Sequence, residues 1–144
     1  MFLILKIIYY SFIHFSVSNW IFVITSDYKE FEKRTNDKKW PIFSNTAHKK
    51  VLKVGDRILF YKGGADGQKF LGRANLASAL KRLNDLNSYV MLSDIEVWKK
   101  QPSIRHMIPD LTFVVHKQMW GIHLQGGVIT LFDRDYDYIS SRSH

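Results

Sequence analysis

Two β-type runs joined by a glycine-rich turn constrain the fold of this chain more than any other segment. Residues 53–64 read KVGDRILFYKGG, and residues 69–77 read KFLGRANLA. The first run begins at a tight Gly55-Asp56 turn, and Gly63, Gly64 and Gly67 supply the turn that joins the two runs into a hairpin. Tryptophans precede and follow this hairpin along the chain. The pattern predicts a small barrel in which distant aromatic side chains could wall a pocket for a flat ring.

The rest of the chain alternates short strands with short helices. Residues 20–25 are aromatic and β-branched, as in a buried strand. A helix is expected next, with Asp27 and Glu30 at the spacing of a capping box. A further strand is predicted over residues 89–98 and a terminal helix over residues 133–139. The 144 residues contain neither a repeat nor a linker. We therefore predict one α+β domain, a small, mixed and mostly antiparallel barrel of five to six strands flanked by short helices.

The charge of the chain points to an anionic partner. Lys and Arg number 21 against 13 Asp and Glu, which gives a formal net charge of +8. Nucleic acid is the commonest specific partner of such a surface, because phosphate neutralisation releases counterions. A solvated basic face and a membrane surface are the alternatives. The absence of cysteine excludes disulfides and thiolate chemistry and fits a cytoplasmic location.

The apolar N-terminal segment, residues 1–18, raises the alternative of a signal peptide or a membrane anchor. Lys6 and His14 interrupt it, and its positive n-region is weak. Residues 16–18, Ser-Val-Ser, resemble a cleavage site. We favour a domain whose natural start lies near Val17, or an added peripheral element, because residues 19–25 already read as the first core strand. The domain is then expected over residues 19–140, with a disordered tail at residues 141–144.

Catalytic and metal-binding patterns find little support. The histidines are His14, His48, His106, His116, His123 and His144. They have no metal-ligand spacing, and no activated serine or phosphate-binding glycine loop is present. Asp133, Asp135 and Asp137 are explained more simply as a solvated first turn of the terminal helix. We expect no catalytic residue, no metal and no cofactor.

Aromatic residues beside cations favour a binding function instead. Trp40 follows Lys38 and Lys39 in a polar loop, and Trp98 precedes two lysines. Trp120 follows a His-Lys pair. Such side chains stack on bases and contact phosphates. Core packing is the alternative for each tryptophan, and Arg73 could serve either a salt bridge at the barrel rim or a phosphate contact.

Several segments together resemble the EVE domain, a PUA-like domain related to the YTH domain. They are Trp20, Trp40, KVGDRILFY at residues 53–61, FLGRA at 70–74, IPDLTF at 108–113, WGIHLQG at 120–126 and a terminal DYDYI helix. The resemblance spans residues 19–139 and rests on the order and spacing of these segments. It implies a PUA-like barrel with a pocket for a modified base, either modified cytosine or methylated adenine.

The resemblance also implies roles for individual residues. Trp40 matches the aromatic wall of the YTH cage, although Pro41 replaces the small hydroxyl residue that often follows it. Residues that match the edge of the base or the cleft are Thr25, Ser26, Asp27, Trp98, Trp120 and His123. The cations expected at the flanking phosphates are Lys39, Lys49, Lys50 and Arg73.

The sequence thus predicts a non-catalytic module that binds DNA or RNA carrying a modified base. Two alternatives stay open. One is an enzyme that modifies or processes RNA or nucleotides on a PUA-like scaffold. The other is a membrane-associated interaction module anchored by residues 1–18. The sequence leaves the oligomeric state undetermined.

Overall fold

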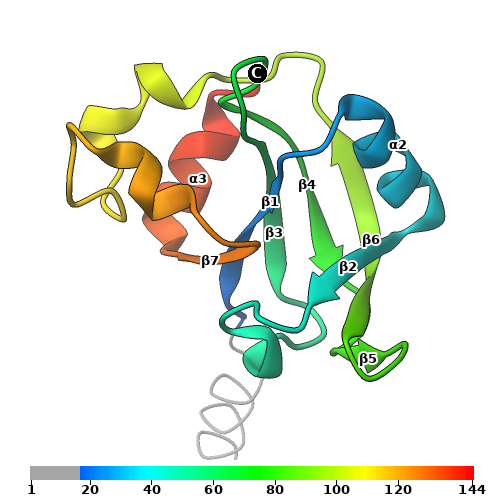
Figure 1. Cartoon of the computed structure of the whole chain (residues 1–144). Coiled ribbons are helices and arrows are strands. Elements are labelled where there is room, and N and C mark those ends of the chain that lie inside the picture. Colours follow the sequence, from blue (N-terminus) through cyan, green and yellow to red (C-terminus); the bar gives the residue numbers. More distant parts are fainter. Residues whose placement is uncertain (1–16) are drawn as a thin grey trace, which may run out of the picture.

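A computed structural model describes residues 17–144 as one curled sheet with two helices packed around it (Figure 1). The strands are β1 (Asn19–Ile24), β2 (Lys39–Phe43), β3 (Arg57–Lys62), β4 (Lys69–Leu76), β5 (Lys81–Arg82), β6 (Asn87–Val97) and β7 (Val128–Leu131). The helices are α2 (Tyr28–Asp37) and α3 (Asp133–Ser141), with short 3-10 turns at Lys49–Val51, Ile104–His106, Ile108–Asp110 and Trp120–Leu124. The predicted α+β barrel class is confirmed, and the two-residue β5 raises the strand number to seven.

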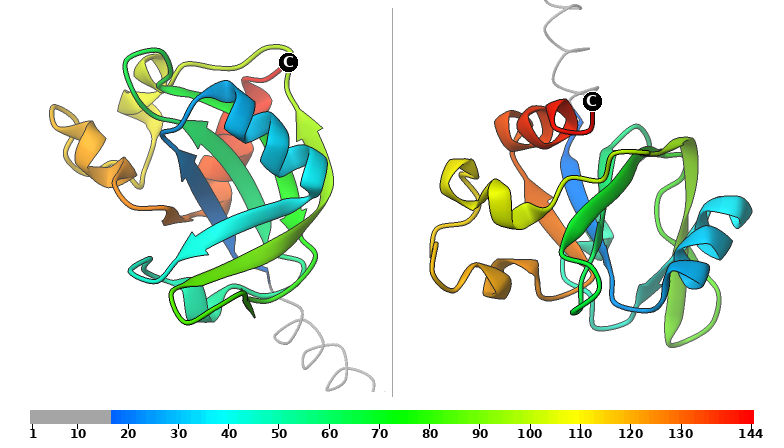
Figure 2. Two further views of the ribbon diagram at one scale, coloured as in Figure 1. Left: turned by 45° about the vertical axis from the view of Figure 1, so that its right-hand side comes forward. Right: turned by 90° about the horizontal axis from the view of Figure 1, so that it is seen from above.

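The strand order is β2-β6-β4-β3-β1-β7, with β5 paired to β6 outside this path. β1 and β3 are parallel, with Asn19 opposite Arg57, and the other pairs are antiparallel. β2 and β7 are therefore the two outer strands. The sheet curls so far that these two edges approach one another as a half-barrel (Figure 2). The gap between them is called the seam below.

The predicted hairpin forms the centre of this sheet. β3 pairs with β4 from Arg57 opposite Asn75 to Lys62 opposite Lys69. Successive side chains of β3 point to opposite faces, as in any strand. Ile58 and Phe60 join a core cluster inside the curl, whereas Leu59 and Tyr61 join a second cluster on the outer face. Burial on both faces explains why this run is almost continuously apolar.

The turn of the hairpin is held by a buried lysine. Lys62 is 2% exposed, and its ammonium donates to the carbonyl of Gly63 at 2.7 Å and to the carboxylate of Asp66 at 3.0 Å. The phenol of Tyr28, at the start of α2, donates to the carbonyl of Asp66 at 2.8 Å. The turn is thereby fixed to the first turn of α2. The hydrogen bond from Lys62 holds the pKa of Asp66 below its ordinary value of 3.8.

This lowered pKa predicts an acid-sensitive contribution to stability. The carboxylate of Asp66 stabilises the fold fully at pH values above 3.8, and the contribution is lost as the pH falls through the lower folded-state value. Asp66→Asn is therefore expected to be less stable than the wild type at neutral pH and to approach it as the solution is acidified. Urea unfolding of both proteins across this pH range measures the effect. A stability difference that stays constant down to the most acidic sample would contradict it.

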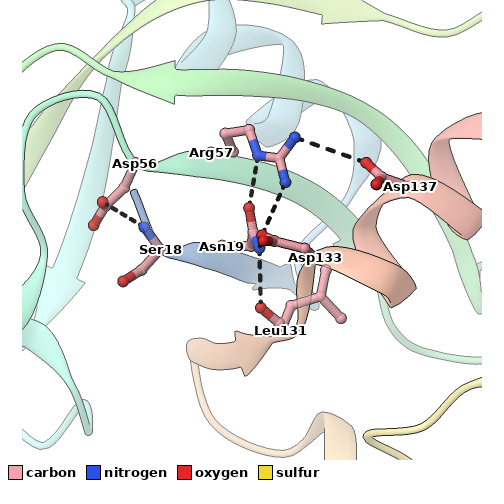
Figure 3. Close-up of polar contacts among 7 residues, drawn as sticks. All are labelled: Ser18, Asn19, Asp56, Arg57, Leu131, Asp133 and Asp137. Atoms are coloured by element: carbon pink, nitrogen blue, oxygen red, sulfur yellow. Dashed lines mark hydrogen bonds and ion pairs between the residues drawn. The ribbon is translucent and has the colours of Figure 1, made fainter. Parts of the chain in front are cut away.

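Asp56 ties the start of β1 to the turn before β3. Its carboxylate is fully buried and accepts from the backbone N–H of Ser18 at 3.0 Å, the indole of Trp20 at 2.9 Å and the backbone N–H of Lys53 at 3.1 Å. Figure 3 shows the contact with Ser18. Hydrogen bonds to an ionised carboxylate are stronger than neutral ones. The Gly55-Asp56 turn is therefore an anchor for β1 as well as an entry to the hairpin.

A second polar network joins β1 and β3 to α3 (Figure 3). Arg57 donates to the amide oxygen of Asn19 at 2.7 Å and pairs with Asp133 at 3.1 Å and Asp137 at 3.8 Å. Its guanidinium also lies 3.9 Å from the ring of Tyr136. These contacts orient the N-terminal turn of α3 over the end of the sheet.

The expectation that the acidic run is only solvated is wrong for Asp135. This residue is fully buried, and its carboxylate accepts from the backbone N–H and hydroxyl of Thr112 and from the backbone N–H of Phe113, at 2.6–2.9 Å. A buried carboxylate is tolerated because three donors replace its water. Asp135 therefore fixes the segment that leads from the Ile108–Asp110 turn toward the seam.

The helix predicted after β1 begins as expected. Asp27 caps α2 by accepting from the backbone N–H of Glu30 at 3.0 Å.

At the other end of the chain, α3 includes Ser141, the first residue of the predicted tail, and the carbonyl of His144 accepts from Lys100 at 3.0 Å. Residues 1–16, most of the predicted N-terminal extension, lie outside the described part. Among the helices of residues 17–144, none has the length and hydropathy needed to cross a membrane.

Candidate nucleic-acid interface

A groove of about 470 Å³ lies at the seam, where the chain leaving β2 faces the chain entering β7. One wall is the loop of residues 45–48, and the other is residues 125–130, with Phe113 and His123 beside them. A smaller cavity of about 20 Å³ adjoins the groove and shares Thr46, Gly127 and Val128 with it. The residues of β2 from Trp40 to Phe43, Val23 of β1 and Arg34 of α2 complete its lining. The groove therefore opens along the unclosed side of the half-barrel.

Tight turns of the backbone shape both walls. His48 has a φ of 65° and Gly126 a φ of 95°, both in the left-handed region, which a glycine adopts readily. The ring of His48 packs 5.6 Å from the ring of Trp20. On the β7 side, the carbonyl of Gly127 accepts from the backbone N–H of Val23 at 3.0 Å. The two walls are thus each fastened to β1.

His123 is held in one orientation within the groove wall. Its Nε2 atom accepts from the backbone N–H of His116 at 3.1 Å, and the two imidazole rings stack at 5.5 Å. Because Nε2 is the acceptor, the neutral ring carries its proton on Nδ1. The groove also contains the amides of Asn45 and Gln125 and the hydroxyls of Thr46 and Thr130. These groups supply both donors and acceptors for the polar edge of a ligand.

Trp40 lies beneath the seam and not on its surface. The residue is 2% exposed, and its ring stacks on Phe60 at 5.0 Å and packs against Phe22 and Phe31. The guanidinium of Arg34 lies 4.6 Å from the same ring. The cavity that Trp40 lines is far smaller than a nucleobase. Alternation along β2 turns the side chain of Trp40 into the core, so its face is not open in this structure, and contact of Trp40 with a base stays a prediction.

Comparison with solved structures identifies the fold. A Rhodopseudomonas palustris protein, Rpa0253, matches with a TM-score of 0.66 at 9% sequence identity, over 88% of this chain and 93% of that one. Human THYN1 in complex with 5-methylcytosine containing DNA matches with a TM-score of 0.62 at 8% identity, over 88% and 98% of the chains. The YTH domain of Zygosaccharomyces rouxii MRB1, in complex with N6-methyladenosine RNA, matches with a TM-score of 0.58 at 15% identity, over 87% and 86%.

The chain has the PUA-like fold of EVE and YTH domains. No protein-family model and no curated protein sequence matches it. The resemblance expected from the sequence is confirmed through the structure, over nearly the whole length of the described residues. The TM-scores of 0.58–0.66 establish the shared fold. Identities of 8–15% carry no residue roles over, so these must be argued from this chain itself.

Trp98 and Trp120 do not meet Trp40 in this PUA-like fold. Trp98 is 6% exposed and belongs to the outer core cluster, with its backbone N–H bonded to the carbonyl of Leu71. Trp120 is half-buried against the same cluster, with the guanidinium of Arg105 5.4 Å from its ring. The sheet separates both residues from the cluster that contains Trp40. The structure therefore does not bring the three tryptophans together, because Trp98 and Trp120 pack in the outer cluster.

The residues expected at the edge of the base lie outside the linings of the groove and the small cavity. Thr25, Ser26 and Asp27 are exposed and follow directly after β1. Asp27 is engaged as the cap of α2, and the methyl of Thr25 faces Gly63 in the hairpin turn. Of the residues matched by resemblance, His123 lines the groove and Trp40 lines the adjoining cavity.

The four expected phosphate ligands are spread over the surface. Lys49 follows the groove loop and donates to the carbonyl of Ser44 at 2.6 Å, and the side chain of Lys50 lies outside the described part. Lys39 lies over the ring of Tyr89 at 4.6 Å, on the α2 side of β2. Arg73 pairs with Glu96 at 2.9 Å and lines a separate hollow with Arg57 and Tyr136. Arg73 is therefore not grouped with the groove.

The groove brings together residues that sequence reasoning did not select. Asn45, Thr46 and Gln125 carry no motif, and their proximity depends on the curl of the sheet. The Gly126-Gly127 pair was the available signal, since adjacent glycines before a strand permit a close approach of the backbone.

Within residues 17–144, no three His, Asp or Glu side chains are grouped as metal ligands.

Proposed function

We propose that this domain is a non-catalytic module that binds nucleic acid and accepts a modified base in the groove at the seam. The observation that carries the proposal is the groove itself, a polar-edged hollow between two unpaired sheet edges. Its volume of about 470 Å³ is in the usual range for sites that enclose a small ligand, which is about 300–1,000 Å³. Human THYN1 and a YTH domain, which share this fold, were solved with methylated DNA and methylated RNA.

The chemistry of the groove suits the edge of a base. Nδ1–H of His123 and the amides of Asn45 and Gln125 are the proposed contacts to its polar atoms. Trp40 lines the small cavity that adjoins the groove and lies beneath the proposed base. Thr46 and Gly127 face one another across the seam and limit its width. Modified cytosine and methylated adenine are the proposed bases.

Three lysines are the proposed contacts to the phosphates of such a ligand. Lys49 and Lys50 follow the loop that forms one wall of the groove. Lys39 is the first residue of β2 and lines the hollow beside α2. The net charge of +8 favours association with a polyanion. Arg73 is omitted from the proposed site because Glu96 neutralises it in another hollow.

A substitution that fills the seam tests the proposal. A Cβ on Gly127 would lie 3.7–3.8 Å from the side chain of Thr46, which is ordinary contact, so Gly127→Leu extends into the groove without backbone strain. We expect Gly127→Leu to weaken binding of a single-stranded oligonucleotide carrying 5-methylcytosine or N6-methyladenine by tenfold or more. Fluorescence anisotropy with the labelled oligonucleotides measures this effect.

Gly121→Leu is the matched control. A Cβ on Gly121 meets no atom within 4 Å, and this residue does not line the groove. We expect the control to bind like the wild type, and thermal unfolding should show that both variants fold. If Gly127→Leu binds methylated and plain oligonucleotides as the wild type does, the base does not enter the seam. Failure of the wild type to bind any of them would reject the function itself.

A further inference from the structure

A second hollow lies on the other side of β2 from the groove, and it is not part of the site described so far. It has a volume of about 300 Å³ and lies between α2, β2 and the start of β6. Phe43, Leu83 and Tyr89 supply its apolar walls, and Lys33, Arg34 and Lys39 supply its cations. Building on the proposed function, we infer that this hollow binds the nucleotide next to the one in the groove. The ligand would then be a single strand that crosses β2.

The aromatic side chains of the hollow are available for stacking. Phe43 is 53% exposed at the end of β2, and Leu83 is 68% exposed. Tyr89 is half-buried, and the ammonium of Lys39 lies 4.6 Å from the centre of its ring. An exposed aromatic ring beside a cation is the combination that holds an unpaired base together with its phosphate.

The hollow continues into the proposed base site. Arg34, Pro41 and Phe43 line both this hollow and the small cavity over Trp40, and that cavity shares Thr46 and Gly127 with the groove. The groove, the cavity and the hollow are thus neighbours at the end of β2, and they are the proposed path of the strand. Successive bases of a strand on this path would lie on opposite sides of β2, which a paired duplex does not permit. The inference therefore names single-stranded nucleic acid, or a strand opened locally, as the ligand.

The charge of the hollow agrees with a phosphate backbone. Glu30 is neutralised by Arg34 through an ion pair of 3.0 Å. Lys33 and Lys39 then outnumber Asp37 among the remaining charged lining residues. The anionic phosphate backbone of a nucleic acid would therefore be attracted to this edge of the sheet. A purely apolar partner surface would leave these lysines without a counter-charge.

Binding of ligands of two lengths to two matched variants tests the inference. The short probe is 5-methyldeoxycytidine monophosphate, which can fill only the groove. The long probe is a single-stranded pentanucleotide with a central 5-methylcytosine. Both lengths are also tested with N6-methyladenine in place of 5-methylcytosine. We expect Phe43→Ala to weaken binding of the pentanucleotide about fivefold to a hundredfold, which is the usual effect of losing one stacked base. Binding of the mononucleotide should weaken clearly less than binding of the pentanucleotide, because Phe43 borders the small cavity but does not line the groove. The matched control is Phe132→Ala, because Phe132 is 61% exposed and is not one of the residues that line the hollow.

The outcomes separate this inference from the proposed function. If wild type binds the pentanucleotide and Phe43→Ala binds it as tightly as Phe132→Ala does, the second site is rejected and the groove proposal stands. If Phe43→Ala changes the sedimentation behaviour of the protein and leaves oligonucleotide binding intact, the hollow is an interface between copies and the inference is also rejected. If wild type binds neither length of probe, both proposals fall.

Discussion

Trp40→Ala is expected to lower the free energy of unfolding by about 3–5 kcal/mol, the usual cost of removing a large aromatic side chain from a packed core. The indole is 2% exposed and contacts Phe22, Phe31 and Phe60 inside the curl of the sheet. Alanine would leave a cavity that this rigid aromatic cluster cannot fill. Urea unfolding followed by far-UV circular dichroism measures the loss.

Trp120→Ala provides the comparison within the same chain. Trp120 is half-buried against the outer cluster, so its removal should cost clearly less than that of Trp40. Equal losses in the free energy of unfolding for the two substitutions would contradict the core role of Trp40. So would a Trp40→Ala protein that is as stable as the wild type and no longer binds its ligand, because Trp40 would then be a wall of the binding site. The stability measurement must therefore precede any interpretation of a binding defect in Trp40→Ala.

Asp56→Ala is expected to destabilise the fold by about 3 kcal/mol or more, because each buried donor left unpaired costs about 1–3 kcal/mol. The substitution removes the common acceptor of three N–H groups, from Ser18, Trp20 and Lys53. Two of these donors belong to the start of β1, which lies between β3 and β7 in the sheet. Chemical denaturation measures the loss. Hydrogen exchange should show weaker protection of the β1 amides.

Asp85→Ala separates this effect from a general loss of negative charge. The side chain of Asp85 is 95% exposed and pairs only with an exposed Arg82, so its removal should change stability by less than about 0.5 kcal/mol. Equal destabilisation by both substitutions would contradict the anchoring role of Asp56. A loss confined to Asp56→Ala, together with weaker β1 protection, is the expected result.

Local signals in the sequence predicted several elements of the fold, although β2 was expected as a polar loop. The Gly55-Asp56 turn, the glycine-rich hairpin turn and the Asp27 cap are confirmed by the structure. Each signal depends on contacts between residues that are close in the chain. The same local reasoning was incomplete for the run Asp133-Arg-Asp-Tyr-Asp. Asp135 is buried there because Thr112 and Phe113 supply donors from a distant segment.

The candidate site was harder to predict than the fold. Trp40 was selected for its polar surroundings in sequence, but β2 pairs with β6 and turns the indole into the core. His123 was matched by resemblance and does line the groove. Asn45, Thr46 and Gln125 gave no signal, because a single exposed amide or hydroxyl has no pattern of its own. Whether any of these residues contacts a base stays a prediction.

The sequence by itself determined the α+β class, the central hairpin, the basic charge and the likeness to PUA-like domains. These properties follow from turn chemistry, from alternation along strands and from composition, which act over short stretches of chain. Only the tertiary structure decided which tryptophans are buried and where a ligand can enter. Both depend on the curl of one sheet, which leaves one edge of β2 and one edge of β7 unpaired and brings Thr46 opposite Gly127. The seam is a product of long-range strand pairing, and no local pattern in the chain records it.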